Sequence, residues 1–520
     1  MRKLKLIDCP VFFVDLQTTG AKPESGNIVE IAWGKCEGAI TSLLVEQPDS
    51  EPIPRRIQML TGIKETDMFG AIPISEVMSR FQNFISDPQN QNGLCIIHFA
   101  QFEKPFLRSA FKGDIPFPIL CTLEIAKRLY PHLPSRGIKG LAGFFGNNTG
   151  EFKRANCHVD ATRMIWKRLV RELTAQGIHT LEELLFWLAA TPKIKKSRYE
   201  YPLPKEKRLQ LPDVPGIYRM LNSRGEVLYV GKATSLFHRV NSYFRGQKNR
   251  DSKKLEMLTQ VYDIRVTTCG SPLEAALMET DEIKNLNPYY NIALKVGFRS
   301  LIFFNRDFTS MNDVCDEEHM YGPYSSALVF HSMLKLNEFA RSTDINSLPS
   351  EDLFYEIIDP ELILTGLGLL CIRHGLELKD LSSMRSIMAL GLIWERRIRD
   401  EDEIEKTELT AEDIADKFER HFMRVGRAYI KSRKLNEMLN CRIIFNEQDS
   451  SQQELCIRNG KICKDQLNEN QDIPWQNEIV QTYDRMTVLT TELERIKTQG
   501  GRYKIISKGL NILLPLSSQK

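Results

Sequence analysis

The stretch Gly216–Lys232 reads "GIYRMLNSRGEVLYVGK", and its pattern sets the fold expected for the middle of the chain. Two short apolar runs, "GIYRML" and "VLYVGK", flank a segment rich in the turn formers Asn, Ser and Gly. Short aromatic and β-branched runs separated by such a segment predict a β-hairpin. Tyr218 and Tyr229 are then expected on neighbouring strands.

The residues that follow the hairpin carry groups suited to phosphodiester cleavage. Arg239 and Tyr243 are four residues apart and share one face of a predicted helix. Lys232 lies at the strand-to-helix turn, where it could lower the pKa of a neighbouring phenol enough for that phenol to act as a base. Glu279 lies on the amphipathic helix "PLEAALMETDEIKNL" and is expected to face the sheet. A cation, an activated water and an Arg or Lys on the phosphate are what this reaction needs.

These motifs resemble the GIY-YIG endonuclease domain, in the branch found in the N-terminal half of the repair nuclease UvrC and in its short relative Cho. Residues 216–218 and 229–231 match the motif that names the family, and "MYGPYS" from Met320 resembles the segment that follows this domain in UvrC. The positions that match the family's catalytic residues are Tyr218, Tyr229, Lys232, Arg239, Tyr243, Glu279 and Asn291.

The resemblance implies a role for each position. Tyr229 would deprotonate the attacking water with the help of Lys232, and Arg239 would stabilise the phosphate that the other two tyrosines position. Glu279 would hold one Mg²⁺ or Mn²⁺. The products would be a 5′-phosphate and a 3′-hydroxyl. In UvrC this half of the protein cuts on the 3′ side of a lesion, which implies damaged duplex DNA as substrate and UvrA and UvrB as possible partners.

The N-terminal region contains a second candidate site. The buried strand pattern "VFFVDLQTTG" ends in a turn just after Asp15. Glu103 in "HFAQFEKPFL" and Asp160 in "HVDATRMIW" lie on other predicted elements of an α/β domain. Several carboxylates brought together in this way can hold the two cations of a phosphodiesterase, so all three acids are candidate metal ligands.

These three motifs, with "LTGI" at Leu60–Ile63, resemble the DnaQ-type 3′→5′ exonucleases, which are built on an RNase H-like sheet and include the polymerase III epsilon subunit. Two positions depart from the family pattern. Gln17 stands where the family has Glu, and Ala155 stands where it has the His that acts as base. His158 is expected to point elsewhere. We therefore expect a degenerate domain that serves as a DNA-binding or docking platform.

The chain is predicted to be a multidomain α/β and α+β protein with a mostly helical C-terminal region. The expected boundaries are an RNase H-like domain over 1–175, a helix and basic linker over 176–208, a GIY-YIG domain over 209–298, a UvrC-like extension over 299–342, and a helical region of unassigned role over 343–520. The whole plan resembles bacterial fusions of an epsilon-like domain with Cho.

Composition limits the classes that remain. A chain of 520 residues is too long for one core, and its longest apolar runs are too short to span a bilayer. The eleven cysteines include no CxxC pair, and Cys456 and Cys463 flank an Asn-Gly turn typical of a hairpin. We expect reduced thiols, no signal peptide, and a cytoplasmic, nucleoid-associated protein. Residues 204–299 contain 16 Lys and Arg against 10 Asp and Glu, which favours a polyanionic partner.

Two other functions fit the same residues. The first is a 3′→5′ exonuclease for proofreading, attached to the replication machinery, and the missing Glu and His argue against it. The second is a non-catalytic scaffold that binds DNA and a repair partner. The second nuclease core, the helix-hairpin-helix motifs and the cysteine cluster of UvrC are not found in the sequence, and the charged segment Trp394–Arg420 has no convincing UvrB-binding motif.

Overall fold

The structure is a computed structural model of the whole chain. It describes residues 3–48, 53–88, 90–91, 93–147, 152–190, 199–245, 251–291, 300–349, 358–395, 410–446, 452–463 and 478–507. Residues 191–198 of the predicted basic linker and residues 396–409 of the charged segment lie outside these ranges.

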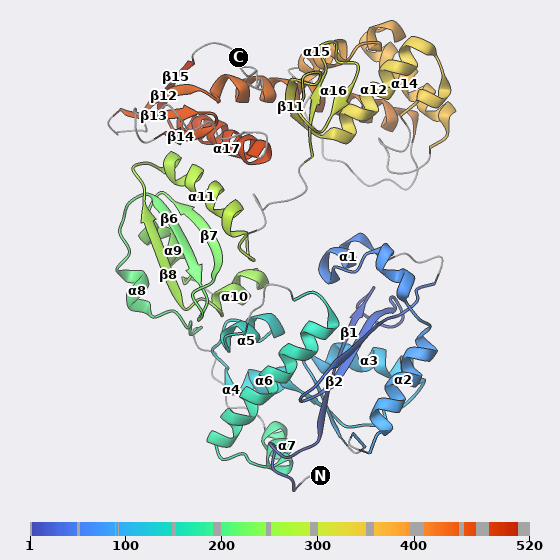
Figure 1. The fold of residues 1–520 in the computed structure, drawn as a ribbon, viewed down its shortest axis with the longest axis vertical. Coiled ribbons are helices and arrows are strands. Elements are labelled where there is room, and N and C mark those ends of the chain that lie inside the picture. The colour runs from blue at the N-terminus through green and yellow to red at the C-terminus, as the bar shows by residue number, and fades with distance from the viewer. Residues whose placement is uncertain are drawn as a thin grey trace. The chain divides into compact units, whose positions relative to one another are not determined.

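A five-stranded mixed sheet forms the centre of the N-terminal domain (Figure 1). Its strands are β1 (Val11–Thr18), β2 (Ile28–Lys35), β3 (Ile40–Leu44), β4 (Leu94–Ile97) and β5 (Ile119–Cys121). The order is β3-β2-β1-β4-β5, in which β2 runs antiparallel to both of its neighbours while β1, β4 and β5 are parallel. This is the sheet of the RNase H-like fold, and it confirms that prediction.

Helices cover both faces of this sheet because β1 alternates its side chains between two cores. Phe12 and Val14 pack in one core with residues of α2 and α3, while Phe13 packs in the other with residues of α4 to α7. The helices are α1 (Arg55–Thr61), α2 (Ile74–Ser86), α3 (Ala100–Phe111), α4 (Thr122–Leu129), α5 (Ile138–Phe144), α6 (Ala155–Ala175) and α7 (Leu181–Ala189), with a 3₁₀ turn at Glu65–Gly70. Asp15 and Gln17 follow Phe13 at intervals of two, so they lie on the α6 face.

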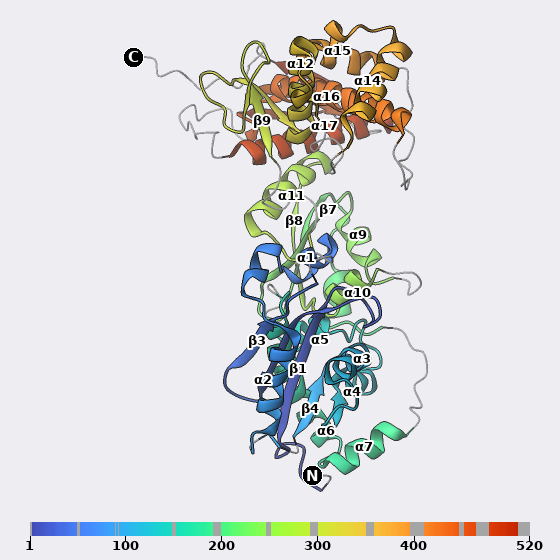
Figure 2. The ribbon, with the colours of Figure 1, turned by 90° about the vertical axis from the view of Figure 1, so that its right-hand side faces the viewer.

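A three-stranded antiparallel sheet with the order β7-β6-β8 forms the centre of the middle domain (Figures 1 and 2). Its elements are α8 (Lys205–Leu209), β6 (Gly216–Leu221), β7 (Val227–Ala233), α9 (Leu236–Ser242), α10 (Ser252–Leu258), β8 (Asp263–Thr268) and α11 (Pro272–Leu286). The predicted hairpin is confirmed, and its register places Tyr218 opposite Gly231.

The rest of the chain is mostly helical, as predicted, but it also contains two sheets. The helices are α12 (Ala327–Ser342), α14 (Pro360–His374), α15 (Met384–Glu395), α16 (Ala411–Met438) and α17 (Ile479–Thr498), with 3₁₀ turns at Ile345–Ser347 and Leu378–Leu381. The strands of the first sheet are β9 (Leu301–Phe304), β10 (Met311–Asn312) and β11 (Tyr321–Ser325). Those of the second are β12 (Cys441–Asn446), β13 (Gln453–Arg458), β14 (Lys461–Cys463) and β15 (Arg502–Ser507).

The hairpin expected around Cys456 and Cys463 exists, with these two cysteines paired in register. It forms one edge of a four-stranded antiparallel sheet that the sequence did not predict, because its central strand β12 pairs with β15 more than fifty residues later. Within the described parts of the chain, all eleven cysteines are free thiols. No described helix is both long enough and apolar enough to cross a membrane.

Contacts divide the chain into two compact units. The first contains Met1–Ala275 and Pro288–Ala293, and the second contains Ala276–Asn287 and Leu294–Lys520. The first unit thus holds the RNase H-like domain together with most of the middle domain. The greater part of α11 belongs to the second unit.

Candidate active sites

Three tyrosines meet at the sheet of the middle domain. Tyr218 comes from β6, Tyr229 from β7, and Tyr243 from the end of α9. Their ring centroids are 6.1 to 6.3 Å apart in all three pairs, and the hydroxyls of Tyr218 and Tyr243 lie 2.9 Å from each other. The predicted cluster is therefore present, with its rings in direct contact.

The three phenols differ in exposure. Tyr218 is fully buried and Tyr243 nearly so, whereas Tyr229 is half-buried. Burial, followed by the neighbouring phenols of Tyr243 and Tyr229, raises the pKa of Tyr218 well above its usual value. Tyr218 therefore keeps its proton and serves as a hydrogen-bonding group. Of the three, Tyr229 is the phenol that solvent and a substrate can reach.

Arg239 supplies positive charge at the exposed edge of this cluster. Its guanidinium carbon lies 5.5 Å from the ring centroid of Tyr243, within the range of a cation–π contact, and its side chain is exposed. An exposed guanidinium beside buried phenols is suited to bind a phosphate that approaches from solvent. Arg239 and Tyr243 thus lie together, as their spacing predicted.

The two glycines of the motif are required by close packing. A Cβ on Gly231 would lie 2.4 Å from the Tyr218 hydroxyl oxygen and 2.9 Å from Cε1 of Tyr229. A Cβ on Gly216 would lie 2.3 Å from the carbonyl oxygen of Thr267 in β8. Gly231 therefore leaves the space that the two tyrosine rings occupy.

Asn291 holds the strand that carries Tyr229. Its side-chain Oδ1 accepts a hydrogen bond from the Val230 N–H and its Nδ2 donates one to the Val230 carbonyl, each at 2.9 Å. The side chain is nearly fully buried. The sequence placed Asn291 among the catalytic residues, but both groups of its amide are engaged with the backbone. The structure makes Asn291 a positioning residue for β7.

The last two predicted residues are Lys232 on β7 and Glu279 on α11. Lys232 is half-buried. It is the second-to-last residue of β7 and pairs in register with Ile217 of β6. Glu279 is half-buried on α11, in the part of that helix that belongs to the second unit. The roles expected of these two side chains stay predictions.

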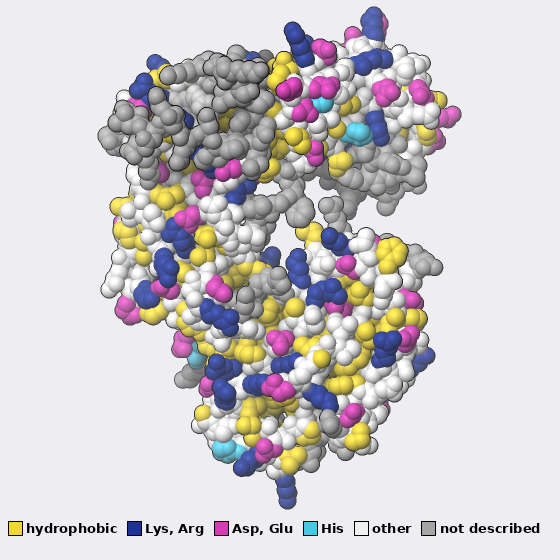
Figure 3. Space-filling model, viewed as in Figure 1, with side chains coloured by type: hydrophobic (Ala, Val, Ile, Leu, Met, Phe, Trp, Pro, Cys, Tyr) yellow, Lys and Arg dark blue, Asp and Glu magenta, His cyan; other side chains and the backbone are white. Residues whose placement is uncertain are grey.

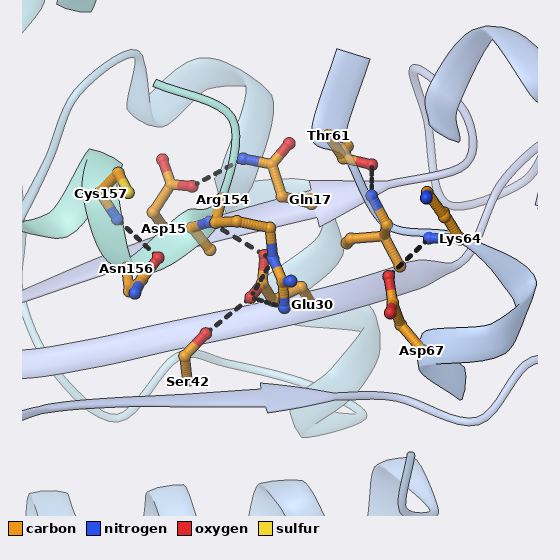
Figure 4. A network of polar contacts seen from close by, with 12 residues as sticks. Asp15, Gln17, Glu30, Ser42, Thr61, Lys64, Asp67, Arg154, Asn156 and Cys157 are labelled. Carbon is orange, nitrogen blue, oxygen red and sulfur yellow. Dashed lines mark hydrogen bonds and ion pairs between the residues drawn. The ribbon is translucent and has the colours of Figure 1, made fainter. Parts of the chain in front are cut away.

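The acidic site of the N-terminal domain is closed by its own hydrogen bonds (Figure 4). The Gln17 Nε2 donates to Oδ2 of Asp15 at 3.1 Å, in place of the second carboxylate that the family pattern would put there. His158 Nδ1 lies 3.2 Å from Asp15 Oδ2 and 3.3 Å from Gln17 Nε2. The expectation that His158 points away from this site was wrong. On α6 its side chain reaches the carboxylate on β1.

The charge of Asp15 acts on both ionisable groups beside it. Burial acts to lower the pKa of His158, but the Asp15 carboxylate outweighs burial and raises that pKa. Glu103 is nearly fully buried, and burial, followed by the charge of Asp15, raises its pKa well above the usual range. Without a cation, the Asp15 carboxylate thus shifts both neighbours toward their protonated forms.

The third predicted acid is not part of this cluster. Asp160 is exposed on α6, and the described contacts of Asp15 involve Gln17, Glu103 and His158. Position 160 falls on the outer side of the helix because it lies two residues after His158, about 200° around its axis. The structure thus does not bring Asp160 to Asp15 and Glu103 as expected.

An acid that the sequence did not single out occupies the start of α6 instead. Glu30 is opposite Gln17 in the β1–β2 register and is 1% exposed. It accepts hydrogen bonds from Arg154 at 2.7 to 3.1 Å, from the N–H of Ala155 at 2.9 Å, and from Ser42 at 2.7 Å (Figure 4). Ala155, expected at the position of a lost base, thus anchors the helix through its backbone. The one signal for Glu30 was an acid in the apolar run "NIVEIAW".

The N-terminal site does not fit the two-cation arrangement of the exonucleases that its motifs resemble. No group of three or more His, Cys, Asp or Glu side chains among the described residues could hold a metal ion. Oε2 of Glu103 and Nε2 of His158 are buried without a hydrogen-bond partner, but the amide of Gln17 carries no negative charge where the family pattern has a carboxylate. We derive no catalytic step from this site.

Within the first unit, the N-terminal domain packs against the middle domain through α5. A Cβ on Gly143 would lie 1.9 Å from Gln260 Oε1, so the helix backbone and this side chain are in close contact. The Tyr262 hydroxyl donates to the Phe144 carbonyl at 2.7 Å, and Lys139 Nζ donates to the Tyr289 hydroxyl at 2.9 Å. Tyr289 is two residues before Asn291, so this contact supports the segment that holds β7.

Comparisons with known proteins agree with this two-domain arrangement. The family model of the UvrC-like GIY-YIG domain matches residues 214–292. A protein of Mycobacterium tuberculosis (strain CDC 1551 / Oshkosh), provisionally named as a bifunctional exonuclease/endonuclease, is 31% identical over 313 residues, which make up 57% of this chain and 46% of that protein. The UvrABC system protein C of Pelodictyon phaeoclathratiforme is 39% identical over 137 residues, 25% of this chain and 22% of that protein.

A solved structure is also similar to the middle domain. The magnesium-bound N-terminal GIY-YIG endonuclease domain of UvrC from Thermotoga maritima is 28% identical, covers 17% of this chain and 94% of that chain, and gives a TM-score of 0.16. The chain spans less than half the length of both curated relatives. The predicted fusion of an exonuclease-like domain with a UvrC-like GIY-YIG domain is confirmed.

The first prediction concerns Gly231. The variant Gly231→Ala should lower the free energy of unfolding by about 1–3 kcal/mol, because its Cβ overlaps the rings of Tyr218 and Tyr229. Urea unfolding, followed by tyrosine fluorescence, measures the change. Gly270→Ala is the matched control, since the nearest atom to its Cβ is a flexible side-chain oxygen at 3.4 Å. Equal stability of the two variants would contradict the packing argument.

The second prediction concerns Glu103. A carboxyl whose pKa is raised on folding binds more protons in the folded than in the unfolded protein, so its contribution to stability is present at low pH and falls as pH rises above about 4.3, its unfolded value. Glu103→Gln has no carboxyl to ionise, so this loss of stability with rising pH is absent in the variant. The thermal midpoint of the variant relative to wild type, measured in chelator, should therefore increase from pH 4 to pH 8. Glu76→Gln, an exposed acid on α2, should show no such trend. A pH-independent difference for Glu103→Gln would mean that the acid is ionised in the fold.

Proposed function

We propose that the protein is a metal-dependent DNA endonuclease that nicks damaged duplex DNA through the tyrosine site of its middle domain. The observation that carries this is the convergence of Tyr218, Tyr229 and Tyr243 with Arg239, within the residues that match the UvrC-like GIY-YIG model. Incision on the 3′ side of a lesion, and delivery of the DNA by UvrA and UvrB, belong to the same proposal. The similarity to UvrABC system protein C supports them.

The chain's own residues perform most of the reaction. Arg239 binds the scissile phosphate at the exposed edge of the cluster. Tyr218 and Tyr243, joined by their hydroxyls and in ring contact with Tyr229, hold Tyr229 and Arg239 in position for that phosphate. Tyr229 in its phenolate form takes the proton of the attacking water. The water oxygen forms the new bond to phosphorus, the bond to the 3′-oxygen breaks, and the products are a 5′-phosphate and a 3′-hydroxyl.

Glu279 would hold a single Mg²⁺ or Mn²⁺. Its half-buried carboxylate fits that role, because Mg²⁺ is usually bound by one or two carboxylates together with waters and phosphate oxygens. The cation, when bound, supplies a Lewis acid for the charge that develops on the phosphate.

The N-terminal domain would act as a platform. The hydrogen bonds that close the cluster around Asp15 support the view that hydrolysis there is lost, and the contacts of α5 with the middle domain support a docking role. On the face of the molecule shown in Figure 3, Lys and Arg side chains are interspersed with acidic ones. On that face, contact with DNA phosphates would therefore use separate basic side chains.

The third prediction tests this function by nicking of a duplex with one bulky adduct, labelled separately at each end, in Mg²⁺. Wild type should make one discrete nick on the 3′ side of the adduct. Tyr229→Phe and Glu279→Gln should lower the rate by about 10²–10⁴-fold, because each removes a group used in proton transfer or cation binding. Asp15→Ala should leave the nick unchanged. An undamaged duplex of the same sequence is the control for lesion dependence.

Two other outcomes would contradict the proposal. A ladder that shortens from the 3′ end and is lost only in Asp15→Ala would make the N-terminal domain an active exonuclease. Absence of cleavage, even when UvrA and UvrB are added, would make the chain a DNA-binding scaffold.

A further inference from the structure

The part of α11 that carries Glu279 is fastened to the C-terminal region by two ion pairs, one buried on both sides and one between a buried arginine and an aspartate whose side chain is 35% exposed. Lys284 Nζ lies 2.6 Å from Asp484 Oδ2 on α17, with side chains 5% and 7% exposed. Arg485, the next residue of α17, donates from Nε and Nη2 to Asp281 Oδ1 at 2.8 and 2.6 Å. All of these residues belong to the second unit, as does Glu279.

Arg485 also joins α11 to the late hairpin. Its Nη1 donates to the carbonyl of Gly460, in the turn between β13 and β14, at 2.9 Å. The Gly460 N–H in turn donates to the carbonyl of Leu439 just after α16, also at 2.9 Å. Arg485 is 3% exposed, and its bond to the carbonyl of Gly460 is buried. Three segments that are far apart in sequence thus meet on one side chain.

The order of the charges fixes how α11 lies on α17. Asp281 and Lys284 are three residues apart on one face of α11, and they meet Arg485 and Asp484, which carry the complementary signs. A shifted or reversed contact would place like charges together in a buried environment, which costs far more than an exposed mismatch. The pairs therefore specify one register of the helix.

Glu279 lies on the other side of α11. It precedes Asp281 by two residues and Lys284 by five, which at 100° per residue places it about 200° and 140° away around the helix axis. The helix thus uses one face to bind the C-terminal region and leaves the opposite face to present Glu279. Because the face with Asp281 and Lys284 is held against α17, the direction in which Glu279 points from α11 is fixed.

We propose that Asp484 and Arg485 are positioning residues of the endonuclease, and that the C-terminal region sets the position of the metal-binding carboxylate by holding α11. This inference rests on the proposed function, since it takes Glu279 as the metal ligand. It gives residues 343–520, whose role the sequence left open, a part in the reaction. A displacement of α17 would carry Glu279 with it.

The test is a double-mutant cycle on the full chain with Lys284→Met, Asp484→Leu and the combination of both. Each single variant leaves one buried charge without its partner, whereas the combination replaces the pair by apolar side chains. Two quantities are measured: the Mg²⁺ concentration for half-maximal nicking, and amide hydrogen exchange along α11. Glu437→Gln, which breaks an exposed ion pair with Arg433 on α16, is the control.

If the inference is right, each single variant raises the half-maximal Mg²⁺ concentration by about tenfold or more, as loss of a group supporting a ligand does. The rate at saturating Mg²⁺ changes less, and exchange in α11 becomes faster. The combination returns both quantities toward wild type, and Glu437→Gln changes neither.

Other results would overturn it. Unchanged exchange in the single variants would mean that the pairs do not hold α11. Faster exchange with an unchanged Mg²⁺ requirement would mean that they hold the helix without positioning the ligand. If the wild type does not nick at all, the proposed function fails instead. The Mn²⁺ affinity of the same proteins, measured by electron paramagnetic resonance, then decides the inference separately: an affinity lowered in the single variants and restored in the combination supports it, and an unchanged affinity overturns it.

Discussion

The endonuclease-like site depends on the close approach of Tyr218 to Gly231 across the β6–β7 hairpin. Because residue 231 has no side chain, a fully buried phenol can lie directly against the partner strand, with its hydroxyl beside that of Tyr243. The same approach brings the ring of Tyr229 to the cluster from the other strand. The two hydrogen bonds between the Asn291 side chain and the Val230 backbone then fix the position of β7. A larger residue at 231 would separate the parts that the chemistry needs together.

In the N-terminal domain the elements of a nuclease-like site are kept, but one of its charges is missing. There the strand, the helix and the acid on β1 are all present, but a neutral amide at position 17 in place of a carboxylate changes the electrostatics. The amide of Gln17 donates a hydrogen bond to Asp15 where a carboxylate would repel it and call for a cation. With His158 bonded on the other side, the carboxylate of Asp15 is engaged by two side chains of the protein and the site has one carboxylate fewer to attract a metal. The fold is kept because Glu30 and Arg154 hold α6 on the sheet independently of these groups.

Local patterns made the middle site predictable from the sequence. The hairpin, the glycines and the spacing of Arg239 and Tyr243 all lie within thirty residues and obey the periods of strands and helices. The N-terminal site was harder because its members come from distant segments. Whether His158 or Asp160 faces β1 depends on the rotation of α6, which the buried network of Glu30 sets and a motif does not. In the same way, β12 and β15 pair although they are more than fifty residues apart. Of the second sheet in the C-terminal region, the sequence therefore predicted only the hairpin.

Two different kinds of contact therefore hold the residues of the proposed reaction in place. In the proposed reaction the base comes from the β6–β7 hairpin and the phosphate contact from α9, which follows it, and local packing sets the geometry of both. The ligand helix is held by buried charges on α17, whose pairing is specific because a misplaced buried charge is costly. Apolar packing alone would have tolerated a rotation or a slip of α11 by a turn, and a shift of that size would move a carboxylate by more than a metal–oxygen bond length. Charge pairs are the better device where one orientation of a helix matters, and here they occur on the helix that carries Glu279.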